Sequence, residues 1–447
     1  MIAEGLQGAD GKVFAAPHPT GLRPATFSRE GRRDALDVAA VLDHRLDPGL
    51  TQPIAVAFSG GGDSLGALIA TKAWADGCGR PVIALHVDHG LQAASGDWRA
   101  FAATAADRLG VSFHVLAWTG EKPVRGLAAA ARQARHGLIA EAARAARAST
   151  VVFGHTADDI AEGVLMRAAG SSLGSPREWA PSPVWPEGRG VFLLRPLLGV
   201  RRAAIREALR ARGWDWIDDP ANADLRQPRA RARRELNGAM GASTPDDCDT
   251  LSPAGLAAVV DWGAIRFDRD ALRQAPPAAG RRVLGAAMLS AGGGERPPRA
   301  GRVEALLARL IGADDFAATL AGAKLVAARR EALVVRDAGE IARGGLSRMA
   351  LDPGRATVWD GRFEFRAGGP GLAVGPLKGS QSRLDKDAQR RLKDGPAEAR
   401  PALPVIIDET GALTCPILAG PPGIGAHCLV GARFSAACGA ILREPRV

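Results

Sequence analysis

The sequence predicts an α/β protein whose first large domain is a doubly wound parallel sheet. Short apolar runs alternate with segments of helical spacing, and a glycine-rich turn joins the first apolar run to the helix after it. The composition is that of a globular chain, because 46% of the 447 residues are hydrophobic and 24% are charged. At about 150 residues per domain, this length indicates two or three domains.

The alternation begins at residue 53 and continues to about residue 198. The predicted strands are residues 53–58, 80–88, 111–118, 149–155 and 191–194, and the predicted helices are residues 65–75, 98–109, 126–146 and 158–168. Strands that alternate with helices are typical of a parallel sheet covered on both faces. Before this region, only residues 33–45 have helical spacing.

The remainder of the chain is less regular. Residues 169–190 include a stretch rich in Gly, Ser and Pro, which predicts a structureless insert that is either a functional flap or disordered. Residues 200–236 are helical and arginine-rich but are interrupted at residues 218–222, and residues 242–253 resemble a linker. We therefore predict an N-terminal extension (1–50), the α/β domain with its arginine-rich end (51–240), a helical domain (254–330) and a smaller mixed or β-rich C-terminal domain (331–447).

The cysteines and the chain start exclude several classes of protein. The five cysteines are scattered and form no C-x-x-C pair, which argues against a disulfide framework, a zinc ribbon and an iron–sulfur cluster. The first ten residues lack a basic segment followed by an apolar one, and no apolar run reaches the ~18 residues that cross a bilayer. We expect a cytoplasmic protein with no membrane partner, and the sequence leaves a homodimer open.

The charge balance favours a polyanionic partner. The 58 basic and 48 acidic residues leave a net charge of +10, and only seven of the basic residues are lysines. Arginine suits phosphate better than lysine does, although a GC-rich genome would produce the same bias. Residues 121–147 and residues 201–235 each carry a net charge of +4. This clustering favours a localised nucleic-acid footprint, whereas any single arginine could equally belong to a solvated helix face.

The glycine-rich turn is the most specific motif in the sequence. Three successive glycines between a strand and a helix allow backbone N–H groups to surround an anion, and the helix N-terminus adds its dipole. Flanking hydroxyls can donate to phosphate oxygens, and the aspartate is suited to hold a magnesium ion that bridges phosphates. The predicted nucleotide-binding residues of the turn are Ser59, Gly60, Gly61, Gly62, Asp63 and Ser64.

This turn differs from two common phosphate-binding motifs. It lacks the Gly-Lys-Ser/Thr ending of a Walker loop and the spacing of a dinucleotide site. It matches instead the S-G-G-x-D-S signature of the PP-loop ATP pyrophosphatases, which split ATP into AMP and pyrophosphate. The alternative is a strand-to-helix turn that binds no ligand.

Two further polar clusters follow predicted strands. His86 and Asp88, with His89 beside them, end the second strand, where polar side chains of a parallel sheet face the ligand crevice. His155, Asp158, Asp159 and Glu162 lead from the fourth strand into a helix. A single histidine is more often structural, and one aspartate can cap the helix. The other carboxylates could hold magnesium or orient an amine, and Glu162 falls on the same helix face as the aspartates.

Taken in order, these motifs resemble the tRNA(Ile)-lysidine synthases of the PP-loop superfamily. The resemblance rests on S-G-G-G-D-S, H-V-D-H-G-L, A-R-Q-A-R-H (131–136), H-T-A-D-D-x-A-E, R-P-L-L (195–198), and D-D-P-A-N-A-D followed by R-A-R-A-R. It covers residues 50–236 in detail and extends loosely to residues 403–411, which look like the closing strand pair of the family. The chain departs from the family pattern at His136, Ile160, Gly163, Ala230 and residues 173–177.

The resemblance implies a two-step reaction that uses ATP and magnesium. The wobble cytidine of an isoleucine tRNA with a CAU anticodon is adenylated, and the amine of L-lysine then displaces AMP. It implies catalytic roles for Asp63, which would also hold the metal, and for His155, Asp158, Asp159 and Glu162. The candidate tRNA-binding residues are Arg132, Arg135, Arg195, Arg229, Arg231 and Arg233. The aromatic side chains of Trp179 and Trp214 could stack on an unpaired base, and for Trp214 a place in the core is the alternative.

Three other functions fit the sequence less well. A tRNA thiolase on the same scaffold needs catalytic or cluster-binding cysteines, and only Cys78 lies in the α/β domain. An amidotransferase needs a glutaminase domain, for which the first 50 residues are too short. A non-catalytic RNA-binding protein explains neither the glycine-rich turn nor the carboxylates.

Overall fold

The structure is a computed structural model that describes residues 34–91, 95–171, 174–219, 228–236, 255–260, 262–420 and 423–446. Several expected features therefore lie outside the described residues. These are residues 1–33 of the N-terminal extension, residues 220–222 of the interruption and the linker at residues 242–253. Across the described residues, no helix combines the length and the apolarity that a bilayer crossing requires.

The first half of the chain forms a six-stranded sheet. Its strands are β1 (Ile54–Ala57), β2 (Val82–Asp88), β3 (Ser112–Ala117), β4 (Thr150–Val152), β5 (Trp179–Pro181) and β6 (Phe192–Leu194), in the order β3-β2-β1-β4-β6-β5. β5 runs antiparallel to β6, whereas the other neighbours are parallel. The predicted α/β fold class and its five parallel strands are confirmed.

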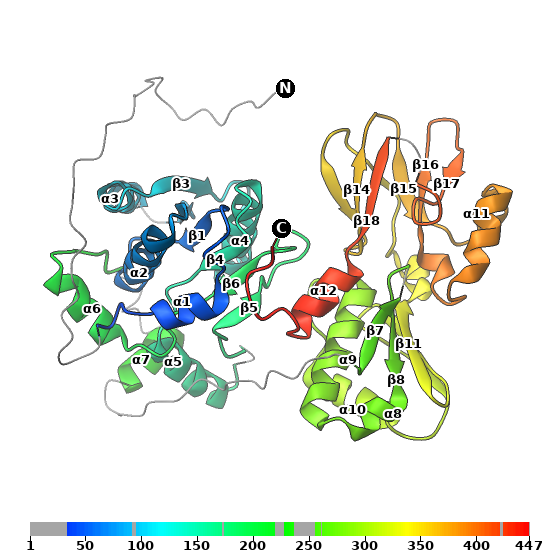
Figure 1. Ribbon diagram of the computed structural model, residues 1–447, viewed down its shortest axis with the longest axis horizontal. Coiled ribbons are helices and arrows are strands. Elements are labelled where there is room, and N and C mark those ends of the chain that lie inside the picture. Colours follow the sequence, from blue (N-terminus) through cyan, green and yellow to red (C-terminus); the bar gives the residue numbers. More distant parts are fainter. Residues whose placement is uncertain are drawn as a thin grey trace. The chain divides into compact units, whose positions relative to one another are not determined.

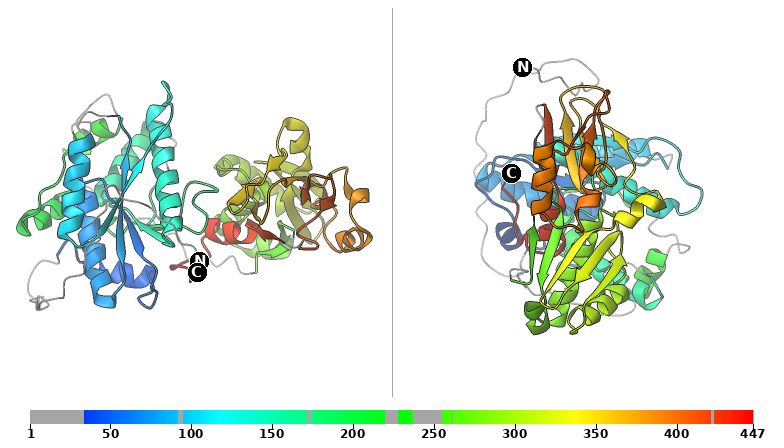
Figure 2. Two further views of the ribbon diagram at one scale, coloured as in Figure 1. Left: turned by 90° about the horizontal axis from the view of Figure 1, so that it is seen from above. Right: turned by 90° about the vertical axis from the view of Figure 1, so that its right-hand side faces the viewer.

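Helices cover both faces of this sheet (Figure 2). They are α1 (Ala39–Arg45), α2 (Gly62–Cys78), α3 (Ser95–Arg108), α4 (Leu127–Ala145), α5 (Ala157–Ala168), α6 (Arg202–Ala211) and α7 (Pro228–Leu236). Apolar residues of α1, α2, α3 and α6 pack in one buried cluster on one face, and those of α4 pack in a second cluster on the other. The sheet is therefore doubly wound, as predicted.

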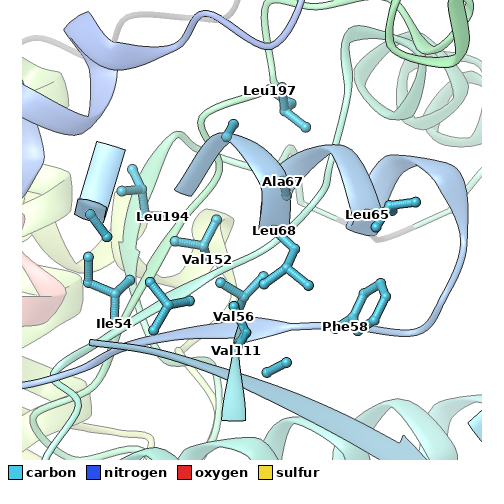
Figure 3. Close-up of a cluster of buried hydrophobic side chains, with 14 of the residues drawn as sticks. Ile54, Val56, Phe58, Leu65, Ala67, Leu68, Val111, Val152, Leu194 and Leu197 are labelled. Atoms are coloured by element: carbon cyan, nitrogen blue, oxygen red, sulfur yellow. The ribbon is translucent and has the colours of Figure 1, made fainter. Parts of the chain in front are cut away.

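The alternation of side chains along β1 explains why both faces are buried. Ile54 and Val56 belong to the same buried cluster as Leu65 and Leu68 of α2, and Val56 lies next to Leu68 in Figure 3. Ala55 belongs to the cluster on the opposite face. Ile54, Val56 and Ala55 are all fully buried. A strand with both faces covered needs a continuous apolar run, and residues 53–58 supply it.

The strand order places a ligand crevice between two strands. The chain fills the sheet from β1 outward to β3 on one side and then crosses back to β4 on the other side of β1. In open α/β sheets, ligands bind where the order reverses, outside the carboxyl ends of the strands. Residues that follow β1 and β4, namely the glycine-rich turn and the segment from His155, therefore meet at this edge.

The expected structureless insert contains a strand that the sequence did not indicate. In β5, Trp179 stacks on Phe192 of β6 with ring centroids 5.0 Å apart, and its Nε1 donates to the carbonyl of Ile441 at 2.8 Å. Trp179 is 9% exposed, so its ring belongs to the core and is not free to stack on a base. Three strand residues within a Gly, Ser and Pro-rich stretch are too short to produce a recognisable pattern.

The expected helical domain at residues 254–330 contains helices, but it also contains strands that the sequence did not indicate. The elements after the linker are β7 (Ala257–Val260), β8 (Ala264–Asp268), α8 (Arg269–Gln274), α9 (Pro277–Gly292), α10 (Ala300–Leu310), β9 (Phe316–Leu320), β10 (Ala323–Ala327) and β11 (Glu331–Arg336). The strands form one antiparallel sheet in the order β7-β8-β11-β10-β9. Because β11 pairs with both β8 and β10, the expected boundary after residue 330 cuts through this sheet.

The last part of the chain is β-rich, as predicted (Figure 1). One sheet has the order β12-β15-β16-β17 and another the order β13-β14-β18. The strands are β12 (Met349–Ala350), β13 (Ala356–Trp359), β14 (Phe363–Ala367), β15 (Ala373–Pro376), β16 (Pro404–Ile407), β17 (Leu413–Thr414) and β18 (Ile424–Cys428). The helices are α11 (Lys386–Arg391) and α12 (Val430–Ala437), with short 3-10 turns η2 (Ala338–Arg343), η3 (Gln381–Arg383), η4 (Leu392–Asp394) and η5 (Arg400–Ala402). The expected strand pair near residues 403–411 is present as β16 and β17.

The end of the chain is anchored to the α/β domain by a buried ion pair. Residues Ala35–Val447 form one compact unit, and within it Arg80 donates to both carboxylate oxygens of Glu444 at 2.6 and 3.1 Å. Ser149 Oγ adds a third hydrogen bond to this carboxylate at 3.1 Å. Both charged side chains are almost fully buried, so the pair is shielded from water, and both oxygens of the carboxylate accept hydrogen bonds.

Candidate active site

The glycine-rich turn has the geometry of an anion cradle. It follows β1 and leads directly into α2, whose first residue is Gly62. Gly60 has a φ of 86°, a left-handed conformation that favours glycine, and a Cβ there would lie 2.5 Å from the side chain of Ile217. The hydroxyls of Ser59 and Ser64 lie 3.1 Å apart. The structure thus brings the predicted nucleotide-binding residues of this turn together at a helix N-terminus.

Two other segments close around this turn. Ile217 N donates to the carbonyl of Gly60 at 3.0 Å, and a Cβ on Gly62 would touch the ring of Trp216 at 3.3 Å. From the end of β4, Gly154 packs so tightly that a Cβ would lie 2.4 Å from the carbonyl of Asp63. These close backbone approaches fix the turn in place, and the sequence analysis had assigned no role to Trp216, Ile217 or Gly154.

Asp63 is a carboxylate with one paired and one unpaired oxygen among the described residues. Its Oδ2 accepts from Arg202 Nε at 2.7 Å, while its Oδ1 is buried without a hydrogen-bond partner. Burial raises the pKa of Asp63, although Arg202 acts in the opposite direction. No group of three or more potential metal-binding side chains occurs in the described part of the chain. One free carboxylate oxygen beside a phosphate cradle fits magnesium, which usually takes few protein ligands together with phosphates and water.

The residues at the end of β2 take local roles. The Nδ1 of His86 lies 3.0 Å from the carbonyl of Phe58, at the end of the neighbouring β1, and burial lowers the pKa of this histidine. Asp88 Oδ1 accepts from the N–H of Gly90 at 2.9 Å, which is a turn contact. His89 packs edge-on against Trp118. His86 and Asp88 therefore lie beside the cradle, and their contact with a nucleotide stays a prediction.

The two aspartates after β4 face different elements. Asp159 and Thr156 form a capping box at the start of α5, with Thr156 N donating to Asp159 Oδ2 at 2.8 Å. Asp158 instead accepts from the backbone N–H of Arg202 at 2.8 Å and pairs with the side chain of Arg201 at 3.1 Å. Asp158 thus caps α6, whereas Asp159 points to the same side as Glu162.

Three arginines surround Asp159 and Glu162. Arg202 of α6 lies 3.1 Å from Glu162 and 3.5 Å from Asp159. From α7, Arg233 Nε donates to Glu162 Oε1 at 2.8 Å, and Arg229 lies 3.5 Å from Glu162 and 3.7 Å from Asp159. Burial works to raise the pKa of Asp159, but neighbouring charges, Arg202 among them, and the Thr156 N–H lower it below its usual value. Asp159 therefore stays ionised.

Arg202 joins the two halves of the site. The same guanidinium contacts Asp63 of the cradle and Glu162 of the carboxylate pair. Its side chain is only 14% exposed, and these carboxylates raise its pKa even though burial opposes them. The sequence analysis missed Arg202, and the only available signal was its place in an arginine-rich window.

His155 is held as a neutral imidazole. Its Nδ1 accepts from Arg195 Nε at 3.2 Å, which leaves the proton on Nε2. Burial and the charge of Arg195 lower the pKa of His155 to about 3. At neutral pH this side chain can donate a hydrogen bond through Nε2, but it is a poor proton acceptor.

Four of the six predicted tRNA-binding arginines line one cavity. The cavity has a volume of about 1220 Å³, and Arg132, Arg135, Arg195 and Arg229 lie on its wall with His155 and Asp159. Burial lowers the pKa of Arg135 and of Arg195 to about 10 in each case, and nearby arginines add to the effect. Arg135 Nε is buried without a hydrogen-bond partner. Two desolvated cations, Arg135 and Arg195, the first with a spare donor, are suited to an anion.

The other two predicted arginines lie on α7 outside the lining of this cavity. Arg233 turns toward Glu162, and Arg231 is exposed. Trp214 stacks against Arg108 at 3.7 Å and packs on the core of the α/β domain. Neither Trp214 nor the buried Trp179 faces the cavity.

This chain is similar to known proteins along most of its length. Residues 36–240 match a family model described as a PP-loop domain. A tRNA(Ile)-lysidine synthase of Caulobacter vibrioides is 51% identical over 375 residues, which cover 84% of this chain and 88% of that protein. The protein of the same name from Hyphomonas neptunium is 36% identical over 319 residues (67% and 86%), and that of Brucella canis is 32% identical over 404 residues (84% and 89%). The similarity to the Caulobacter protein is longer than the PP-loop match and therefore extends into the C-terminal half.

Proposed function

The chain belongs to the family of tRNA(Ile)-lysidine synthases, and on that premise we propose that it joins L-lysine to the wobble cytidine of an isoleucine tRNA with a CAU anticodon. ATP would activate the cytidine, with release of pyrophosphate and then AMP. The observation that carries this proposal is the contact of one guanidinium, that of Arg202, with both the phosphate cradle and the carboxylate pair. Two chemical steps on one substrate need such a shared site.

In the first step the cytidine O2 would attack the α-phosphate of ATP. Backbone N–H groups of Gly60–Gly62 and the hydroxyls of Ser59 and Ser64 would stabilise the charge that grows on the phosphates. A bound magnesium ion would neutralise part of that charge. Asp63, whose Oδ1 lacks a hydrogen-bond partner among the described residues, is the residue that would hold it.

In the second step the ε-amine of lysine would attack the activated carbon and displace AMP. Free lysine has a pKa near ~10.4, so its ammonium must bind and then lose a proton to solvent water before the amine attacks. Asp159 and Glu162 supply charge of the right sign, and the lowered pKa of Asp159 keeps that carboxylate ionised. Asp159 thus binds and orients the amine more effectively than it accepts a proton. His155, neutral and with its proton on Nε2, would donate to a substrate oxygen.

The tRNA would lie on the arginine-lined cavity next to this site. Arg132, Arg135, Arg195 and Arg229 line it, and the exposed Arg231 would extend the surface along α7. Phosphate contacts of this kind position RNA without reading its sequence. We propose that the protein acts in the cytoplasm.

Two substitutions separate the steps. Asp63→Asn should reduce tRNA-dependent pyrophosphate release and lysine transfer together by about a hundredfold, because the metal and phosphate charge are involved in both. Asp159→Asn should leave pyrophosphate release within about threefold and reduce transfer of labelled lysine by about a hundredfold. Asp76→Asn, on the exposed side of α2 in a pair with Lys72, is the matched control for loss of one carboxylate. The proposal fails for Asp159 if its replacement changes neither step.

A further inference from the structure

Glu162 is fully buried although it lies in the helix nearest to the proposed lysine site. Its side chain has no exposed surface because three guanidinium groups cover it, from Arg202, Arg229 and Arg233. Its Oε1 accepts from Arg202 and Arg233, whereas Oε2 has no hydrogen bond and lies 3.5 Å from Arg229 Nε. One oxygen of this buried carboxylate therefore has unused capacity for a donor.

The charges around this carboxylate already cancel. Asp63, Asp159 and Glu162 carry three negative charges, and the same three arginines carry three positive charges within 4 Å of them. A lysine ammonium that entered this cluster would meet no net negative charge and would compete with guanidinium groups already in place. In the arrangement described here the site is closed to the substrate that its carboxylates should bind.

Two of the three arginines belong to a weakly packed helix. α7 has the sequence PRARARREL, and the only side chains that it buries among residues 229–236 are those of Ala230 and Ala232. Alanine methyl groups bury little apolar area, so the arginine–carboxylate pairs contribute much of the attachment of α7 to α5. Arg229 and Arg233 remain 45% and 30% exposed, which leaves their guanidinium groups within reach of an external anion.

We propose that Arg229 and Arg233 occupy the position of the lysine ammonium until RNA phosphates draw them away. This inference rests on the proposed function, because it assigns lysine to the carboxylate pair. Arg202 belongs to α6 and keeps its contact with Asp63, so only the two α7 cations leave Glu162. The site then carries a net negative charge that can accept an ammonium. RNA and lysine thus assist each other's binding, and free lysine is kept out of an enzyme that holds no tRNA.

Such coupling is reciprocal and can be measured without any reaction. Equilibrium dialysis of labelled lysine against the protein, with ATP and magnesium omitted, gives the lysine affinity with and without a transcript of the CAU isoleucine tRNA. We expect the transcript to tighten lysine binding about tenfold, and lysine to tighten RNA binding by the same factor. An unchanged lysine affinity, or no measurable lysine binding even with the transcript, would overturn the inference. This comparison uses the unaltered protein and therefore stands whatever happens to variants.

The double variant R229Q/R233Q tests the residues themselves. It should bind lysine about tenfold more tightly than the unaltered protein when RNA is absent, and added RNA should no longer improve lysine binding. Arg234→Gln removes the same charge from an exposed position of the same helix and should leave the RNA-free lysine affinity as it is. R229K/R233K keeps the positive charges, so without RNA it should bind lysine as weakly as the unaltered protein does. Equal lysine affinity in R229Q/R233Q and R234Q would overturn the inference.

Failure of the inference can be told from failure of the proposed function. If the unaltered protein, supplied with ATP and magnesium, transfers no labelled lysine to the transcript, the proposed function is wrong. If it transfers lysine but its lysine affinity does not depend on RNA, the function holds and the role of Arg229 and Arg233 is wrong.

Discussion

Arginine side chains are buried in both halves of the chain, and they differ in what satisfies them. In the C-terminal half, Arg269 is fully buried and donates to the carbonyls of Leu310, Ala328, Gly312 and Asp314. Arg362 likewise donates to Asp360 and to the carbonyl of Ala402. These side chains tie loops and helix ends of their own chain together.

Two buried arginines of the α/β domain, Arg135 and Arg195, are incompletely satisfied. Arg135 has a buried Nε with no hydrogen-bond partner, and Arg195 bonds only to His155 and the carbonyl of Arg177 among the contacts recorded for the described residues. Neither has a carboxylate within 4 Å in the described part of the chain. A buried cation without a counter-charge destabilises the fold unless a ligand supplies that charge. The partners of a buried arginine therefore separate structural arginines from binding arginines, although the sequence alone does not distinguish the two kinds.

Replacement of a structural arginine should have the largest effect on stability. Arg269→Met removes a donor from four carbonyl oxygens, of which, among the described residues, only that of Gly312 keeps a second recorded donor, in Arg273. We expect the free energy of unfolding to fall by about 3–5 kcal/mol in urea titrations. Arg266→Met, at a half-exposed position in an ion pair with Glu331, should change it by less than about 0.5 kcal/mol. Equal losses in the two variants would remove the distinction on which the comparison rests.

A buried histidine reports both the burial and the positive charge around these arginines. Burial, with Arg135, Arg132 and Arg195, lowers the pKa of His136 to about 3, while the unfolded chain keeps the usual value of 6.5. Between these values the unfolded state binds the extra proton, so this stability is present above pH 6.5 and is lost as the pH falls toward 3. The free energy of unfolding should fall between pH 6.5 and pH 5, and in His136→Phe this fall should be smaller by about 2 kcal/mol than in the unaltered protein. If His136→Phe left the dependence of unfolding free energy on pH as it is in the unaltered protein, the arginines around His136 would not carry the uncompensated charge inferred for them.

A binding arginine should affect RNA affinity more than stability. Arg135→Met removes a desolvated charge, so we expect an unchanged or higher melting temperature together with about tenfold weaker tRNA binding and a log–log salt slope that is lower by about one. Arg99→Met, at an exposed position of α3 on the other face of the sheet, is the control for loss of one arginine. A stability loss like that of Arg269→Met would place Arg135 among the structural arginines.

The smallest expected effect belongs to Asp158. Asp158→Ala removes the side chain that caps α6 and pairs with Arg201, and we expect the free energy of unfolding to fall by about 1 kcal/mol. Lysine transfer should fall far less than in Asp159→Asn. If Asp158→Ala abolished transfer while the melting temperature stayed the same, Asp158 would belong to the catalytic group after all.

The sequence made the α/β domain predictable because its signals are local. The glycine turn, the apolar runs and the pair Asp159 and Glu162 lie within short segments, where spacing determines geometry. Arg202 could not be identified in this way, because its contacts with Asp63 and Glu162 join residues 139 and 40 positions away. The same holds for Ile217, which forms an isolated parallel bridge with Gly61 of the cradle although the two residues are far apart in the sequence.

The C-terminal half was harder to predict because tertiary contacts override local preference. Strands such as Ala257–Val260 and Ala323–Ala327 are rich in alanine, which favours helices, and they are recognisable only through their neighbours in the sheet. The donors of Arg269 likewise reach carbonyls more than 40 residues away. Pairing over such distances leaves no periodic pattern in the sequence.

The most direct test of the central claim is an incorporation assay with two RNAs. The protein is incubated with ATP, magnesium, labelled lysine and a transcript of either the isoleucine or the methionine tRNA, both of which carry a CAU anticodon. We predict that label enters the isoleucine transcript only, with pyrophosphate released in equal amount. Label in neither transcript would contradict the assignment of lysine transfer, and label in both would contradict the proposed specificity.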